Sequence, residues 1–323
     1  MTEHPHRRRL PRTLAALLAS VALAGLSLAP ARAAPGPLSL PSFWEQTFTG
    51  TQLRLGKVLS RTSAFTEYAI SYRSNGLRIS GTLHAPKGKG PFPVVVLAHG
   101  YIDPDVYRSG QGLAREQEYL ARKGFVALHT DYRNHAASDD DPDLMRGMRL
   151  GYTADVINAA NAVRSSRLPF LDTTRISLLG RSMGGGIAYN ALVTSPGLFD
   201  SAVLFASVSS KAAENTNRWL RNDPVVRKEI FATYGTPEAN PAFWRELSAF
   251  TYFERISDPM LVLHGTADST CPIRWTDQAV QRLRALGKDV TYVQYRGAGH
   301  TFFDSTWTRS MERTVSFLGR TMA

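Results

Sequence analysis

The segment that contains Ser182 has the residue types and spacing of a serine nucleophile. Its sequence is GRSMG, so that Ser182 has Gly180 two positions before it and Gly184 two positions after it. A serine on a sharp turn from a strand into a helix requires such small residues, because the chain on either side of the serine approaches itself closely. The same turn places the serine at a helix N-terminus, where free N–H groups stabilise negative charge. We therefore predict a nucleophile elbow with Ser182 as its nucleophile.

A serine hydroxyl is a weak nucleophile and needs a base and an orienting acid, which follow an elbow in the order aspartate or glutamate, then histidine. Asp268 comes shortly after the apolar run 260–264, and His300 lies in the glycine-containing segment RGAGHTF. Asp258 is the alternative acid, but it precedes the same apolar run and would lie at the opposite end of the sheet. We expect Asp268 to orient His300 and His300 to act as the general base.

Acyl transfer at such a serine also requires two N–H donors for the oxyanion. The residue after the nucleophile, Met183, supplies the first, and a loop after an early strand supplies the second. The apolar run 94–97 leads into His99, Gly100 and Tyr101. We assign the second donor to the N–H of Tyr101, with that of Gly100 as the alternative.

The elements that must position these residues follow from the spacing of apolar residues. Two alternating runs flank the turn signal Ser74-Asn75-Gly76, which predicts an antiparallel hairpin. Short continuous apolar runs then alternate with helical patterns, as expected for parallel strands that are buried on both faces. The expected strands are 93–98, 125–129, 176–179, 202–206, 260–264 and 290–295, and the expected helices are 111–123, 145–166, 183–195, 274–286 and 303–319. The predicted fold class is α/β, with a mostly parallel, doubly wound sheet.

One segment interrupts this alternation. Residues 208–256 separate two expected strands by more than a usual crossover and are rich in aromatic residues. An insertion of this size at the carboxyl side of a sheet commonly covers the site, so we predict a helical lid. The alternative is a set of packing helices without substrate contact.

The N-terminus has the pattern of a signal peptide. Four arginines precede an apolar run over 14–28, and Ala31-Arg32-Ala33 supplies a cleavage site. We divide the chain into a signal peptide (1–33), a linker with a lead-in helix (34–64) and a catalytic domain (65–323). The protein is then secreted or periplasmic, by the Sec or the twin-arginine route. The alternative is a retained membrane anchor, but the run is shorter than the ~20 residues that span a bilayer, so no stable membrane insertion is expected after cleavage.

Composition limits the remaining function classes. Hydrophobic residues make up 43% of the 323 residues, as in ordinary globular proteins, and the formal net charge is +11. Residues 1–33 hold five arginines and one glutamate, and the remainder has no block of basic residues, so nucleic-acid binding is not expected. Cys271 is the single cysteine, so no disulfide forms within the chain. No metal-ligand spacing occurs, and we expect no metal or cofactor.

With these residues identified, the chain resembles the catalytic domain of the prolyl oligopeptidase (S9) family and the related dienelactone-hydrolase-like esterases over about residues 65–320. The resemblance rests on His99-Gly100, Asp131-Tyr132-Arg133, Gly180–Gly185, Ser248–Tyr252 with Ile256–Pro259, and the loops of Asp268 and His300. It implies an α/β-hydrolase fold, with Ser182, Asp268 and His300 as the triad and the backbones of Tyr101 and Met183 as the oxyanion hole.

Two departures from the family shape the functional prediction. Only about thirty residues precede the first hairpin after the predicted cleavage site, where large peptidases of the family carry a β-propeller. Tyr101 replaces the usual second glycine, and Met183 replaces a frequent aromatic residue. We therefore predict a stand-alone esterase for small or medium carboxylic esters, with an S9-like peptidase for short or acylaminoacyl peptides as the first alternative. An acyltransferase and a binding protein that has lost catalysis are the further alternatives.

Overall fold

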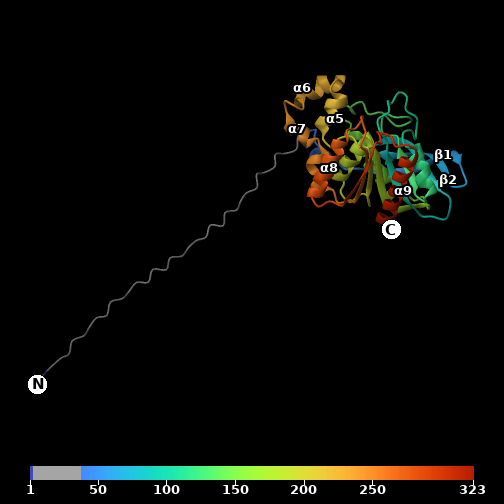
Figure 1. Ribbon diagram of the computed structural model, residues 1–323, viewed down its shortest axis with the longest axis horizontal. Coiled ribbons are helices and arrows are strands. Elements are labelled where there is room, and N and C mark those ends of the chain that lie inside the picture. The colour runs from blue at the N-terminus through green and yellow to red at the C-terminus, as the bar shows by residue number, and fades with distance from the viewer. Residues whose placement is uncertain (3–37) are drawn as a thin grey trace. The chain divides into compact units, whose positions relative to one another are not determined.

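A computed structural model describes residues 1, 2 and 38–323 of the chain. The predicted cleavage site after Ala33 and nearly all of the predicted signal peptide lie outside these residues. The described residues from 38 onward contain one nine-stranded sheet surrounded by helices (Figure 1). Its strands are β1 (Gly50–Arg61), β2 (Phe65–Ser74), β3 (Leu77–Pro86), β4 (Phe92–Ala98), β5 (Val126–Thr130), β6 (Leu171–Arg181), β7 (Ala202–Phe205), β8 (Met260–Gly265) and β9 (Val290–Tyr295).

The strand order confirms the predicted architecture. The order is β1-β2-β3-β5-β4-β6-β7-β8-β9. Strands β1, β2 and β3 pair antiparallel, β3 pairs antiparallel with β5, and the strands from β5 to β9 are parallel. The chain thus has an α/β-hydrolase fold, a mostly parallel sheet with an N-terminal antiparallel hairpin.

Helices cover both faces of the sheet. They are α1 (Leu40–Trp44), α2 (Ala114–Arg122), α3 (Leu150–Arg164), α4 (Met183–Thr194), α5 (Ala212–Asn215), α6 (Phe231–Tyr234), α7 (Pro241–Glu246), α8 (Ile273–Ala285) and α9 (Asp304–Thr321). Neighbouring residues of one strand face opposite layers: Val94 and Val96 belong to the core cluster that includes residues of α3 and α4, whereas Val95 and Leu97 belong to the cluster that includes residues of α2 and α9. Burial of the central strands on both faces explains their continuous apolar runs.

The insertion between β7 and β8 is helical, as expected. It contains α5, α6 and α7, the π-helical turns η1 (Thr216–Leu220) and η2 (Val226–Ile230), and the 3₁₀ segment η3 (Ala249–Arg255). Figure 1 shows α5, α6 and α7 gathered together beyond one end of the strands.

The stretch over 34–64 differs from the prediction of a linker and a lead-in helix. Its helix, α1, has only five residues, and residues 50–61 form strand β1 at the edge of the sheet. Most side chains of β1 are exposed, and its pairing with β2 is interrupted by register shifts. The strand therefore has no regular apolar alternation by which its sequence could be identified.

Within residues 38–323, none of the helices combines the length and the apolar character needed to cross a bilayer.

Candidate functional site

The predicted elbow lies at the carboxyl end of β6. Ser182 links β6 to α4 with φ 57° and ψ −120°, a strained backbone conformation for a residue that is not glycine. Its backbone is anchored, because its N–H donates to Phe205 O at 3.0 Å and its carbonyl accepts from Val208 N at 3.1 Å. A Cβ atom at Gly180 would lie 2.3 Å from the carbonyl oxygen of Gly184. The close approach that requires the two glycines is therefore present.

The structure brings Ser182, His300 and Asp268 into one hydrogen-bonded chain. The Oγ of Ser182 is 3.0 Å from Nε2 of His300, and Nδ1 of His300 is 2.8 Å from Oδ2 of Asp268. The carboxylate accepts from Nδ1–H, which leaves Nε2 to accept the serine proton. Asp258, the alternative acid, instead accepts from the N–H groups of Gly197 and Phe199.

Asp268 is held as an anion by several donors. Its Oδ1 accepts from the N–H of Thr270 at 2.9 Å and of Cys271 at 2.8 Å. Burial raises the pKa of Asp268, but hydrogen bonds from His264, His300 and the N–H of Cys271 outweigh it, so that the pKa lies well below its usual value. The carboxylate is thus ionised at neutral pH.

His264 is a second histidine at this carboxylate, which sequence reasoning did not identify. It is fully buried, with Nε2 2.9 Å from Cys271 O and 3.2 Å from Oδ2 of Asp268. The hydroxyl of Thr276 lies 2.7 Å from its Nδ1. His264 therefore positions the acid loop. Its position four residues before Asp268, at the end of a buried strand, is the signal that could have indicated this role.

The predicted oxyanion donors lie on the two loops beside the nucleophile. A Cβ atom at Gly100 would lie 3.1 Å from Cβ of Ser182, so the loop after β4 runs against the nucleophile. Within residues 38–323, neither the N–H of Tyr101 nor that of Met183 donates to a protein acceptor. Both groups are free to bind a ligand oxygen, and their assignment as the oxyanion hole stays a prediction.

Asp131 holds the loop after β4 in place. This fully buried carboxylate accepts hydrogen bonds from four donors on β3 and on that loop. They are the hydroxyls of Ser80, Tyr107 and Ser109, at 2.6–2.8 Å, and the N–H of Gly110, at 3.0 Å. The sequence singled out Asp131 through its family motif without assigning a role to it, and the structure shows that it orders the loop that carries Tyr101.

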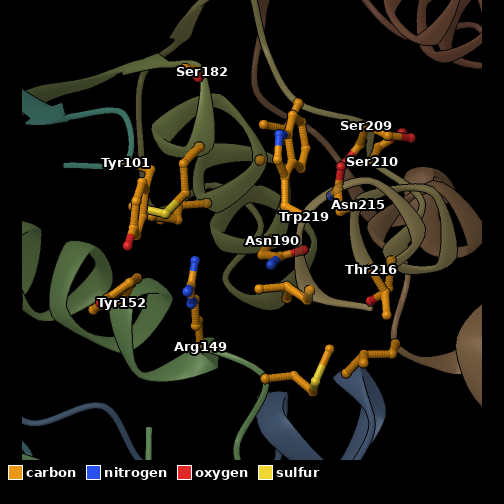
Figure 2. Close-up of a pocket in the computed structure, with 18 of the residues that line it drawn as sticks. Tyr101, Arg149, Tyr152, Ser182, Asn190, Ser209, Ser210, Asn215, Thr216 and Trp219 are labelled. Atoms are coloured by element: carbon orange, nitrogen blue, oxygen red, sulfur yellow. The ribbon is translucent and has the colours of Figure 1, made fainter. Parts of the chain in front are cut away.

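A cavity with a volume of about 680 Å³ opens beside the nucleophile. Ser182 and His300 line it together with Tyr101 and with residues 148–150 and 152. Figure 2 shows Ser182, Tyr101, Arg149 and Tyr152 in this wall. The insertion between β7 and β8 supplies much of the remaining wall, including Trp219. The predicted lid therefore does contribute to the cavity at the nucleophile.

The single cysteine lies next to this chain of residues. Cys271 is fully buried, and Asp268, Cys271 and His300 form the one group of possible metal ligands within 38–323, with ligand atoms within 4.8 Å of one another. Burial and the nearby Asp268 carboxylate raise the pKa of the Cys271 thiol to about 12, against the effect of a hydrogen bond with Ser182. The thiol is protonated at neutral pH, and the other two groups are already hydrogen-bonded to each other. This set is therefore not arranged to bind a metal ion.

Comparison with protein families and with known sequences gives consistent matches. Residues 112–323 match the model of the prolyl oligopeptidase family. The uncharacterized peptidase YuxL of Bacillus subtilis is 24% identical over 283 residues, which cover 85% of this chain and 41% of YuxL. The uncharacterized peptidase YtmA of the same organism is 26% identical over 73% of this chain and 86% of its own length. Human acyl-coenzyme A thioesterase 1 is 25% identical over 65% of this chain and 49% of its own length.

Solved structures share the fold. The acetyl xylan esterase of Paenibacillus sp. R4 superposes with a TM-score of 0.65 and 21% identity, covering 86% of this chain and 92% of the esterase. The acylaminoacyl peptidase of Pyrococcus horikoshii gives a TM-score of 0.61 with 21% identity, covering 81% of this chain and 42% of the peptidase. At these identities the likeness concerns the fold.

Proposed function

Since the chain belongs to the prolyl oligopeptidase family and is a serine hydrolase, we propose that it cleaves carboxylic esters of small or medium size through an acyl-enzyme on Ser182. The observation that carries this proposal is the hydrogen-bonded chain from Ser182 through His300 to Asp268, which lies beside a cavity of about 680 Å³.

In the proposed reaction, His300 Nε2 takes the proton of Ser182 as Oγ attacks the ester carbonyl. The N–H groups of Met183 and Tyr101 bind the oxyanion, and removal of one such donor commonly costs about 3 kcal/mol of transition-state stabilisation. Asp268 stabilises the imidazolium, which returns the proton to the leaving alcohol. Water then resolves the acyl-enzyme by the same steps in reverse.

The charge in the cavity supports esters over free peptides. Arg149 contributes a guanidinium to the cavity that Ser182 also lines. Asp223 contributes a carboxylate, which already accepts hydrogen bonds from the N–H groups of Val225 and Val226. The positively charged amino terminus of a peptide is repelled by the guanidinium, and the Asp223 carboxylate that could attract it is hydrogen-bonded to the backbone of its own segment. The acetyl xylan esterases and the acyl-coenzyme A thioesterases among the similar proteins are named for ester and thioester substrates.

A serine peptidase for short or acylaminoacyl peptides is the second candidate, and it is supported by the relatives that are named as peptidases. Acylated peptides lack the free amino group that Arg149 would repel, so the cavity is compatible with them. An acyltransferase shares the first half of the mechanism and differs only in the acceptor that resolves the acyl-enzyme.

The test compares the protein with its Ser182→Ala variant on 4-nitrophenyl esters of increasing acyl length, beside aminoacyl, acylaminoacyl and dipeptidyl anilides. We expect turnover of the esters, no turnover by the variant, and fluorophosphonate labelling of the unchanged protein alone. Ser305→Ala, which removes an exposed hydroxyl from α9, is the matched control. Labelling of Ser182→Ala would refute the nucleophile, anilides cleaved faster than esters would favour the peptidase, and transfer to an added alcohol would identify an acyltransferase.

We also propose that the protein is exported, on the basis of the basic and apolar pattern of residues 1–33. Expression of the full chain in a bacterium followed by N-terminal sequencing of the exported fraction is expected to find Ala34 as the first residue. A protein that keeps Met1 and stays in the cytoplasm would contradict this proposal.

A further inference from the structure

Arg149 is a charged residue of the cavity that the proposed mechanism does not use. It lies at the start of α3 in the left-handed backbone conformation, with φ 61°, and its N–H donates to Leu144 O at 2.9 Å. Figure 2 shows its side chain projecting between Tyr101 and Asn190, within the cavity that Ser182 and His300 also line. The guanidinium therefore faces the space that a substrate of Ser182 occupies.

The guanidinium has no acidic partner. Its Nε donates to the sulfur of Met145 at 3.2 Å, and its Cζ lies 5.1 Å from the ring centroid of Tyr101. Among residues 38–323, no carboxylate lies within 4.0 Å of it. Four of its five N–H donors thus remain without a protein acceptor.

Two neighbouring arginines, unlike Arg149, are paired with carboxylates. Arg133 binds Asp155 and Asp141, with its closest contacts at 2.8–3.0 Å. Arg146, three residues before Arg149, binds Asp143 at 2.6 Å and Glu229 at 2.5 Å. The carboxylates of this region are therefore engaged elsewhere, and Arg149 is left for a ligand.

Two uncharged donors line the same cavity as Arg149. The side-chain amide of Asn190 and the hydroxyl of Tyr152 have no hydrogen-bond partner within residues 38–323. Burial raises the pKa of Tyr152 to about 12, although the charge of Arg149 acts against this, so its hydroxyl keeps its proton. A guanidinium, an amide and a hydroxyl on one side of a cavity are suited to an acceptor-rich anion.

We propose that Arg149 forms an anion subsite beside the nucleophile and binds a carboxylate of the substrate, so that the preferred substrates are esters that carry a carboxylate as well as the scissile bond. This inference rests on the proposed function of Ser182. It adds a substrate class, because it selects monoesters of dicarboxylic acids or esters of hydroxy acids over neutral esters of the same size.

The test uses substrates matched in size. On the leaving-group side, 4-acetoxybenzoate is compared with 4-acetoxybenzamide; on the acyl side, mono-4-nitrophenyl adipate is compared with 4-nitrophenyl hexanoate. The ratio of kcat/KM for the anionic ester to that for the neutral ester is measured for the unchanged protein, Arg149→Met and Arg149→Lys. Arg54→Met, which removes an exposed positive charge from β1, is the matched control.

We expect the unchanged protein to prefer the anionic ester in at least one of the two pairs. Arg149→Met is expected to reduce that preference by about tenfold or more, mainly through KM, as for loss of a hydrogen-bonded charge pair. Arg149→Lys should keep part of the preference for the anionic ester, and Arg54→Met should keep all of it. Added salt should weaken this preference. An equal ratio in the unchanged protein and in Arg149→Met, for both pairs, would overturn the inference.

A binding measurement separates this inference from the proposed reaction. The two anionic esters are titrated by calorimetry into Ser182→Ala and into Ser182→Ala with Arg149→Met, where no turnover is expected. If no ester is hydrolysed but binding weakens about tenfold without Arg149, the anion subsite is supported and the esterase proposal fails. Binding that is independent of Arg149 would overturn the subsite even if the esters are hydrolysed.

Discussion

Replacement of Gly184 by alanine tests whether close packing of the elbow positions the nucleophile. A Cβ atom at Gly184 would lie 1.9 Å from the carbonyl oxygen of Ala98 and 2.7 Å from that of His99. Both neighbours are backbone atoms at the end of β4, the strand that leads into the predicted oxyanion loop. Because neither can rotate away, the start of α4 and the end of β4 have to move apart.

The size of the effect follows from these distances. An ordinary contact begins near 3.4 Å, so the two segments must separate by about 1.5 Å. Overpacking of this kind typically costs about 1–3 kcal/mol, which corresponds to a decrease in Tm of roughly 2–10 °C. A misplacement of about 1 Å at the reacting atoms can reduce the rate by about 100-fold. We therefore expect kcat to fall by about 100-fold, because Ser182 shifts relative to His300, while the protein stays folded with the moderate decrease in Tm given above.

The assay combines calorimetric Tm with kcat and KM on 4-nitrophenyl acetate. Gly319→Ala is the matched control, because Gly319 lies in α9 and its added Cβ atom would meet no atom within 4 Å. That change is expected to raise stability by about 0.5–1 kcal/mol and to leave the kinetics unchanged. Gly184→Ala with an unaltered Tm and a kcat within twofold of the original value would refute the packing argument.

Three further predictions concern hydrogen-bonded side chains, one beside the Asp268 carboxylate and two elsewhere in the fold. His264→Leu removes a donor to Asp268 and leaves Thr276 and the carbonyl of Cys271 unpaired. The free energy of unfolding in denaturant should therefore fall by about 1–3 kcal/mol, and kcat should fall more than KM changes. An unchanged kcat would exclude a positioning role. Arg133→Met leaves the fully buried Asp155 without its bidentate partner and should cost about 3–5 kcal/mol in urea unfolding, whereas a loss below about 1 kcal/mol would contradict this. Burial raises the pKa of Asp172, but hydrogen bonds from Thr174 and Arg175 outweigh this effect and lower the pKa to about 2. The ionised carboxylate therefore stabilises the folded protein above about pH 4, and this contribution is lost as the pH falls towards 2. The free energy of unfolding of Asp172→Asn should therefore lie below that of the unchanged protein at pH 6 and approach it near pH 2, and a difference that is constant with pH would argue against this assignment.

The central part of the fold was predictable because strands that are buried on both faces have continuous apolar sequences. Strands β4 to β8 are largely buried between the helical layers, whereas the edge strand β9 is only partly buried, and the apolar runs of all six were placed within a few residues of the observed bounds. Strand β1 was missed because an exposed edge strand needs no apolar pattern: only Gly50 and Leu53 of its twelve residues are buried. Its backbone hydrogen bonds with β2 define it, and these depend on no particular side chains.

The site was predictable to the extent that local chain geometry determines residue types. An elbow demands glycines at fixed offsets, so Ser182 could be identified from a few neighbouring residues. His264 was missed because a histidine at the end of a buried strand resembles a core residue, although its partners Asp268, Cys271 and Thr276 follow it closely in the chain. Arg149 was missed because its significance depends on groups from other parts of the chain. For Arg149, that significance is the lack of a nearby carboxylate, which no sequence pattern records.

The order of the strands in the sheet brings the acid and the base together. Strands β8 and β9 are adjacent, and the loops that follow them are hydrogen-bonded to each other, from Ala267 N to Ala298 O at 2.9 Å and from Gly297 N to the Thr266 hydroxyl at 2.9 Å. The Asp268 and His300 loops thus form one unit on paired strands, while Ser182 is fixed separately through its bond to β7. The 208–256 insertion contributes to this framework through Val208, whose N–H donates to Ser182 O, and through Arg218, whose guanidinium donates to Ser269 O. We expect its other side chains to vary without displacing the three reacting groups. Substrate preference is therefore expected to depend on the insertion and on residues 148–152, whereas the chemical step depends on the sheet.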